Sequence, residues 1–279
     1  NTWIITLIPE HVRGRFYGKK SQTAGRYGFF AMLLGGFLLS LGNKTNIWVA
    51  YGLLFFCAMA VKLVSIRYVL LLEEPKEKGI SETKTSFVDF LHHIHQTSFG
   101  KYVMYMCCMS IAVHIAAPFF TPYMLLSQDE GGLGFTYFQF TILHGLAAVA
   151  GFSVLQHWGK ITDRFGNKRV LVFAGFLSPL IPMFWLFSNN FYYLSLVEVF
   201  SGLIWAGFNL ASANYVFDLV GQKMRMIYSA YYNGLTMLAV FAGALLGSGL
   251  YIIGSTLHIH EISFLFFISF IMRLVVALF

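Results

Sequence analysis

Apolar stretches of membrane-spanning length follow one another along almost the whole chain, separated by short polar connections. A helix needs about 20 apolar residues to cross the hydrocarbon core of a bilayer. Stretches of that kind fall at 24–41, 47–72, 102–126, 136–157, 168–188, 191–217, 228–253 and 262–279. The pattern predicts eight membrane-spanning helices, with the last one cut short.

Composition places the chain in the same class. Apolar residues make up 57% and charged residues 11% of the chain, whereas about a quarter of the residues in a soluble domain are charged. The sequence therefore predicts an all-α, polytopic membrane protein that has the lipid bilayer as its solvent.

The net charge of +7 is distributed in an alternating way. The connections at 9–26, 73–101, 158–169 and 221–227 hold five, four, four and two Lys or Arg residues, and the other connections hold only Lys44. Basic connections of membrane proteins face the cytoplasm. The charge thus predicts a multi-pass protein of the cell membrane with cytoplasmic basic loops, and it does not indicate nucleic acid as a partner.

The three cysteines, Cys57, Cys107 and Cys108, all fall within apolar stretches. They are expected to act as small hydrophobic residues, and we expect no disulfide framework, metal site or cofactor. The chain begins with Asn1 and ends inside an apolar run, so we expect it to be a fragment.

A weak internal repeat relates the two ends of the chain. At an offset of 212 positions, Arg13 pairs with Arg225 and Gly35 with Gly247. Parallel repeats remain in transporters built from two six-helix halves. We therefore expect helices five to twelve of a twelve-helix protein, with the first four missing. Residues 1–72 would end the N-terminal bundle, 73–101 form the cytoplasmic inter-bundle loop, and 102–279 form the C-terminal bundle.

The charged run Gly159-x-x-x-Asp163-Arg164-x-Gly166-x-Lys168-Arg169 is read as a tight cytoplasmic turn between two spans. It resembles the signature loop between helices eight and nine of the major facilitator superfamily of secondary transporters. Pro9-Glu10-x-x-Arg13-Gly14-Arg15 is similar to the family's loop after helix four, and Asp218-x6-Arg225 to the acidic-to-Arg spacing after helix ten. Thr6 stands where the repeat would place a second acid, and Ile115 to Met124 is similar to a prokaryotic branch of the family.

The resemblance implies a gate. Asp163 and Arg164 would latch the cytoplasmic ends of helices eight and five together when the transporter opens outward. The alternative is a basic turn that only sets topology. The gating set implied by the motifs is Gly159, Asp163, Arg164, Gly166, Lys168, Arg169, Arg13, Arg15, Asp218 and Arg225.

Candidate solute and proton contacts lie in the tenth and seventh helices. At 100° per residue, Gly202, Trp205, Asn209 and Ser212 each fall within about 40° of Glu198, and the five residues form a polar stripe. Because the tenth helix lines the central cavity in the resembled family, the stripe is a candidate solute contact, with Glu198 a candidate proton carrier. The alternative for Glu198 is a carboxylate near the interface that bonds a neighbouring helix.

Histidines and prolines mark the seventh helix. His114 precedes Pro118 and Pro122, each of which frees a carbonyl and bends a helix. His114 is a candidate for sensing or carrying protons, or a hydrogen-bonded packing residue, and His144 in the eighth helix is a weaker candidate. Small residues at Ala239, Gly243 and Gly247 predict close helix packing. Arg273, like Lys62 and Arg67, is expected to snorkel toward the headgroups.

These patterns predict secondary active transport of a small solute by alternating access, driven by protons, in a protein that works as a monomer. The chain has no Walker loop and no Gly-x-Ser-x-Gly nucleophile turn, so a primary pump or a soluble-type enzyme is not indicated. The alternative is a non-transporting sensor derived from a transporter, or a membrane-embedded enzyme using His114 and Glu198.

Overall fold

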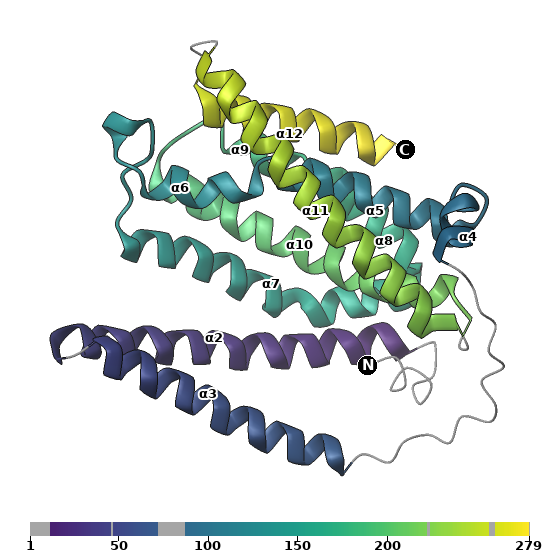
Figure 1. The fold of residues 1–279 in the computed structure, drawn as a ribbon, viewed down its shortest axis with the longest axis horizontal. Coiled ribbons are helices and arrows are strands. Elements are labelled where there is room, and N and C mark those ends of the chain that lie inside the picture. Colours follow the sequence, from purple (N-terminus) through teal and green to yellow (C-terminus); the bar gives the residue numbers. More distant parts are fainter. Residues whose placement is uncertain (1–11, 46, 72–86, 222–223, 257–259, 279) are drawn as a thin grey trace. The chain divides into compact units, whose positions relative to one another are not determined.

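The computed structural model describes residues 12–45, 47–71, 87–221, 224–256 and 260–278, and all regular elements in these ranges are helices (Figure 1). The predicted all-α fold class is thereby confirmed. Contacts divide the chain into two units. One is Thr23–Glu82, and the larger one combines Asn1–Gln22 with Thr83–Phe279.

The smaller unit contains most of α2 (Arg13–Thr45) and all of α3 (Ile47–Leu70). Helix α3 is apolar around its circumference, and its large side chains are exposed, Phe55 and Phe56 among them. A helix with no polar face is suited to lipid. Lys62 and Arg67 are exposed on it, as snorkelling requires.

The larger unit begins with the first turns of α2 and continues from α4 to α12. Its elements are α4 (Phe87–His92), α5 (Ser98–His114), η2 (Ala117–Phe119), α6 (Phe120–Leu125), η3 (Gln128–Glu130), α7 (Tyr137–Phe165), α8 (Asn167–Leu177), α9 (Leu180–Phe184), α10 (Phe191–Leu219), α11 (Arg225–Thr256) and α12 (Glu261–Leu278).

Six stretches of the described residues are long and apolar enough to cross a membrane. They match six of the eight predicted spans. The predicted span 24–41, within α2, is not among them. Neither is 168–188, where the chain is divided into α8 and α9. Pro179 and Pro182 lack the amide that a continuous helix would need at their positions, so the prediction of one unbroken span there is wrong.

The break predicted in the seventh helix is confirmed. Helix α5 ends at His114, and the chain continues through the short 3₁₀ helix η2 into α6. Pro118 lies in η2 and Pro122 in α6. Irregular backbone at membrane depth is tolerated where neighbouring protein covers it, which α11 and α12 do here.

The charged run from Gly159 to Arg169 is not a turn, contrary to the prediction. Helix α7 continues through it to Phe165 and α8 starts at Asn167, so Gly166 is the whole connection. Charge marks where a helix leaves the membrane. The helix need not end there, because its backbone groups stay paired within the helix.

Gly166 has φ 86° and ψ 151°, a conformation that essentially only glycine adopts. Replacing it by alanine is expected to lower the midpoint of thermal unfolding in detergent, at a cost of about 1–3 kcal/mol. No atom lies within 4 Å of the added Cβ, so the effect isolates backbone strain. Gly234 in α11 also has open space, and Gly234→Ala is the matched control. Equal midpoints for the two variants would contradict the strained junction.

Helix α10 lies beside α7 at backbone distance (Figure 1). A Cβ on Gly202 would meet the backbone of Ala147, and one on Gly151 would lie 3.2 Å from the carbonyl oxygen of Gly202. Helix α11 approaches α5 in the same way, because a Cβ on Gly243 would lie 2.7 Å from the carbonyl oxygen of Ile111. The close packing predicted at Gly243 is therefore confirmed.

Candidate functional site

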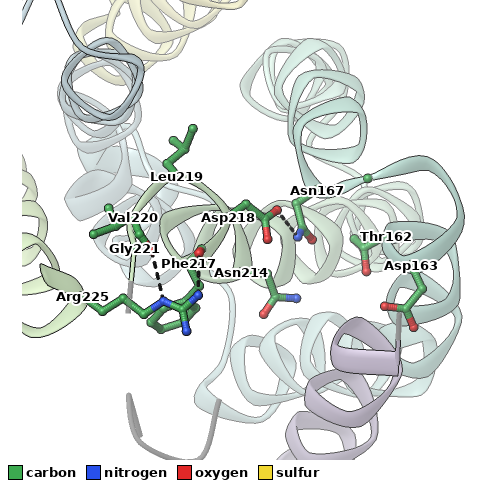
Figure 2. A pocket seen from close by; sticks show the side chains of 11 residues that line it. Thr162, Asp163, Asn167, Asn214, Phe217, Asp218, Leu219, Val220, Gly221 and Arg225 are labelled. Carbon is green, nitrogen blue, oxygen red and sulfur yellow. Dashed lines mark hydrogen bonds between the residues drawn. The ribbon is translucent and has the colours of Figure 1, made fainter. Parts of the chain in front are cut away.

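A pocket of about 480 Å³ opens where the α7–α8 junction meets the α10–α11 junction (Figure 2). We call this the basic end of the larger unit, since it carries two of the basic connections. Residues of the predicted gating set line the pocket, namely Asp163, Gly166, Asp218 and Arg225. Four residues from two separate motifs are thus brought together.

Asp163 lies in the last turn of α7 and contacts the beginning of α2. Its Oδ2 accepts a hydrogen bond of 2.8 Å from the backbone amide of Arg15. Amides in the first turn of a helix have no partner within the helix, and the helix dipole makes that end favourable for negative charge. The carboxylate therefore acts as an N-terminal cap for α2, supplied by another helix.

Glycines allow this contact. A Cβ on Gly18 would lie 2.6 Å from the carbonyl oxygen of Leu155 and 3.3 Å from the Cα of Gly159. The first turns of α2 therefore pack directly on the backbone of α7, one turn before Asp163. Gly159 is buried in this contact, which gives the first glycine of the motif a packing role rather than a turn role.

The cations of the motif point elsewhere. Arg164, Lys168 and Arg169 are exposed, and the Arg164 guanidinium lies 5.2 Å from the ring centroid of Phe165. None of the three lines the pocket. Arg15 is exposed and contributes its backbone amide, while the side chain of Arg13 lies outside the described residues.

Asp218 and Asn167 connect α10 to α8. The side-chain amide of Asn167 donates a hydrogen bond of 2.7 Å to Oδ2 of Asp218, as Figure 2 shows. Asn167 was not a sequence candidate. Its place inside the charged motif, directly after Gly166, is the signal that could have identified it.

Arg225 is buried and closes the end of α10. Its Nε donates 3.1 Å to the carbonyl of Val220 and its Nη2 donates 3.2 Å to that of Phe217 (Figure 2). Carbonyls in the last turn of a helix lack amide partners, and a cation there also meets the negative end of the helix dipole. Arg225 therefore stabilises the α10 terminus within the pocket wall.

Asn214 is a deeply buried polar member of the site. Its side chain is 3% exposed, and its Nδ2 has no hydrogen-bond partner among the described residues. Figure 2 shows it between Arg225 and Asp163, and it also lines a second pocket. A buried donor of this kind is costly unless an acceptor reaches it. Asn214 therefore offers a hydrogen bond to whatever occupies either pocket.

The second pocket, of about 490 Å³, lies between the first turns of α2, α7 and α10. Trp205 and Asn209 of the predicted polar stripe line it, facing Tyr17 and Ser21 of α2. An aromatic face beside a few polar groups is the usual composition of small-molecule sites. Part of the polar stripe therefore lines a pocket.

Gly202 of the stripe also lines this second pocket, whereas Glu198 and Ser212 line neither pocket. The Ser212 hydroxyl donates to the Asn209 carbonyl at 3.1 Å, and the Ser212 carbonyl accepts 2.8 Å from Tyr102. Glu198 is 8% exposed, and no hydrogen bond or ion pair of its carboxylate is present among the described residues. A buried carboxylate without a partner in a membrane helix is by default a functional candidate.

The two histidines have local partners. His114 Nδ1 lies 2.8 Å from the carbonyl of Ser110, one turn earlier in α5. His144 packs edge-on against Phe140 with ring centroids 4.4 Å apart. Within the described residues, no group of three or more metal-binding side chains is close enough to hold an ion.

Comparison with known proteins adds one finding. A family model described as Major Facilitator Superfamily matches residues 133–279, just over half of the chain. The matched range runs from before α7 through α12, and it includes the α7 and α10 residues of both pockets. A comparison with curated proteins finds no match.

Proposed function

Since the chain belongs to the major facilitator superfamily of membrane transporters, we propose that it carries a small solute across the cell membrane by alternating access. Residues 1–72 and 102–279 belong to two bundles, joined by the loop at 73–101. By the positive-inside rule, the basic end faces the cytoplasm.

The observation that carries this proposal is the hydrogen bond between Asp163 and the Arg15 amide. A bond between the end of α7 and the beginning of α2 exists only while these two ends are together. An interaction present in one conformer alone shifts the equilibrium toward that conformer by its own free energy. The Asp163 contact therefore stabilises the state that is closed on the cytoplasmic side and open outward.

The solute contacts Trp205 and Asn209 from α10 and Tyr17 and Ser21 from α2. These two helices belong to different bundles in the proposed division, so a solute between them would be released as the bundles separate. An aromatic ring with nearby amide and hydroxyl groups suits an organic solute that has both an apolar face and hydrogen-bonding groups.

Protons drive the cycle through Glu198, whose carboxyl is buried in α10 without a partner among the described residues. Glu198→Gln is expected to abolish solute accumulation driven by a proton gradient while solute exchange across the membrane continues, because glutamine keeps the shape and cannot release a proton. Glu130→Gln, at an exposed acid in η3, is the matched control and should behave as wild type.

The experiment uses proteoliposomes with a trapped pH indicator, to which sugars, amino acids, organic amines and carboxylic acids are added in turn. A solute that is carried with protons changes the internal pH, and E198Q removes that change. Solute uptake that is indifferent to collapse of the proton gradient would overturn proton coupling. No uptake of any solute by the intact protein would count against transport itself.

A further inference from the structure

Arg273 lies in the middle of the apolar helix α12 and was expected to snorkel to the membrane surface. It is instead 2% exposed, so that prediction is wrong. Within the described residues it has no carboxylate partner. Its Nε donates 3.0 Å to the hydroxyl of Ser269, and its Nη1 donates 3.2 Å to the backbone carbonyl of Ser178. A buried cation that bonds only neutral oxygens in a membrane protein requires a physical reason.

The Ser178 carbonyl is the one that Pro182 leaves without a helical partner. In a continuous helix the amide four residues on would donate to it, and proline has no amide. The Ile181 amide reaches it at 3.3 Å in a tighter turn. Arg273 supplies the second donor, at the end of α8, where the helix dipole also favours a positive charge.

A second carbonyl is freed where α5 breaks. The Ala116 amide donates 3.3 Å to the carbonyl of Val113 rather than to that of Ala112. The Ser269 hydroxyl donates 2.6 Å to the Ala112 carbonyl. A hydroxyl can donate one bond and accept others, so Ser269 bonds Ala112 and receives Arg273 at the same time.

The segments beyond the two breaks also pack on α12. Phe120 of α6 stacks on Phe266 of α12 with ring centroids 4.3 Å apart, and Trp185, which follows α9, lies 6.2 Å from the same ring. Trp185 and Phe266 are both nearly fully buried. The outer segments of two broken helices therefore share one helix as their support.

We propose that Ser269 and Arg273 are positioning residues that tie the breaks of α5 and α8–α9 to α12. Through them α6, α9 and α12 move as one body while the transporter changes state. The residues act through backbone carbonyls and do not contact the solute pocket between α2, α7 and α10. The proposal goes beyond the assignment of transport, because it concerns which parts of the larger unit stay together.

The test is hydrogen exchange, measured by mass spectrometry on the intact protein in detergent. Arg273→Met removes both donors and keeps an apolar stem of similar length. Amides in 112–126 and 178–190 are expected to exchange about tenfold faster, while 137–165 is unchanged, because the Ser178 carbonyl loses a buried bond and the Ser269 hydroxyl loses the donor that holds it toward Ala112. A uniform increase over all these peptides would overturn the proposal.

Two proline variants make the test specific. Pro182→Ala adds an amide four residues after Ser178, so R273M in a P182A background should exchange at the wild-type rate in 178–190. Pro179→Ala adds an amide that points toward the Gly175 carbonyl, which already accepts from the Ser178 hydroxyl. This variant should therefore not restore the wild-type exchange rate. The proposal is contradicted if P182A and P179A both restore the wild-type exchange rate of R273M, or if neither does. If R273M does not accumulate in membranes, the amount of protein in membranes is measured instead of hydrogen exchange. In that case only P182A, and not P179A, should restore the amount of R273M.

Discussion

Gly202→Ala is expected to push α7 and α10 apart and to lower the midpoint of thermal unfolding more than any other single-methyl change considered above. The added Cβ would meet the carbonyl oxygen and carbon of Ala147, which belong to the backbone of α7 and cannot rotate away as a side chain can. Overpacking of a buried contact costs about 1–3 kcal/mol. The measurement is thermal unfolding of the purified protein in detergent.

The control for this variant is Gly249→Ala in α11. Nothing lies within 4 Å of the Cβ that alanine would add there. Because alanine favours a helix over glycine by about 1 kcal/mol, G249A should unfold at or above the wild-type midpoint. The two variants are thus expected to shift in opposite directions. A G202A midpoint at or above wild type would show that α7 and α10 are not in backbone contact.

Asp163→Ala is expected to have the largest effect on the conformational equilibrium, because it removes the carboxylate that caps α2. Loss of an N-terminal cap costs about 1–2 kcal/mol, which corresponds to a five- to thirtyfold larger population of the state that is open on the cytoplasmic side. The probe is Ser21→Cys, in the pocket beside α2, with the three natural cysteines replaced by serine. Its alkylation by a membrane-impermeant maleimide, applied at the basic end, should be faster by that factor.

Two further variants separate the cap from a general effect of charge. Asp163→Asn keeps an oxygen that accepts from the Arg15 amide and loses the charge, so its rate should fall between those of wild type and D163A. Asp129→Ala removes an exposed carboxylate in η3 and should alkylate as wild type. Equal rates for D163A and D129A would contradict the latch, whatever the effect of D163A on stability.

Much of the fold could be predicted from local features of the sequence. Runs of apolar residues predicted six spans that the structure also contains, because a bilayer requires length and apolarity of each span by itself. Pro118 predicted the break after His114 for an equally local reason, the absence of an amide. The break at Pro182 could have been predicted by the same rule, but apolar length alone suggested one continuous span.

The candidate site was predictable in part. Two motifs placed Asp163, Gly166, Asp218 and Arg225 in cytoplasmic connections, and all four line the same pocket. Their partners were not predictable, because Asp163 bonds a backbone amide and Arg225 bonds backbone carbonyls. Backbone groups are the same at every residue, so no pattern of side chains identifies which of them a charge will meet.

By itself, the sequence determined that this is a multi-spanning protein of its family, which segments are apolar enough to cross a membrane, and that one helix breaks near Pro118. These are properties of single segments. Only the tertiary structure decided that Arg273 points inward and donates to the Ser178 carbonyl, and that the Ser269 hydroxyl donates to the Ala112 carbonyl. It also placed Asn214 in the lining of both pockets. Helices that are apolar on nearly every side have little preference for one rotation, so the direction of each polar side chain is set by how neighbouring helices pack.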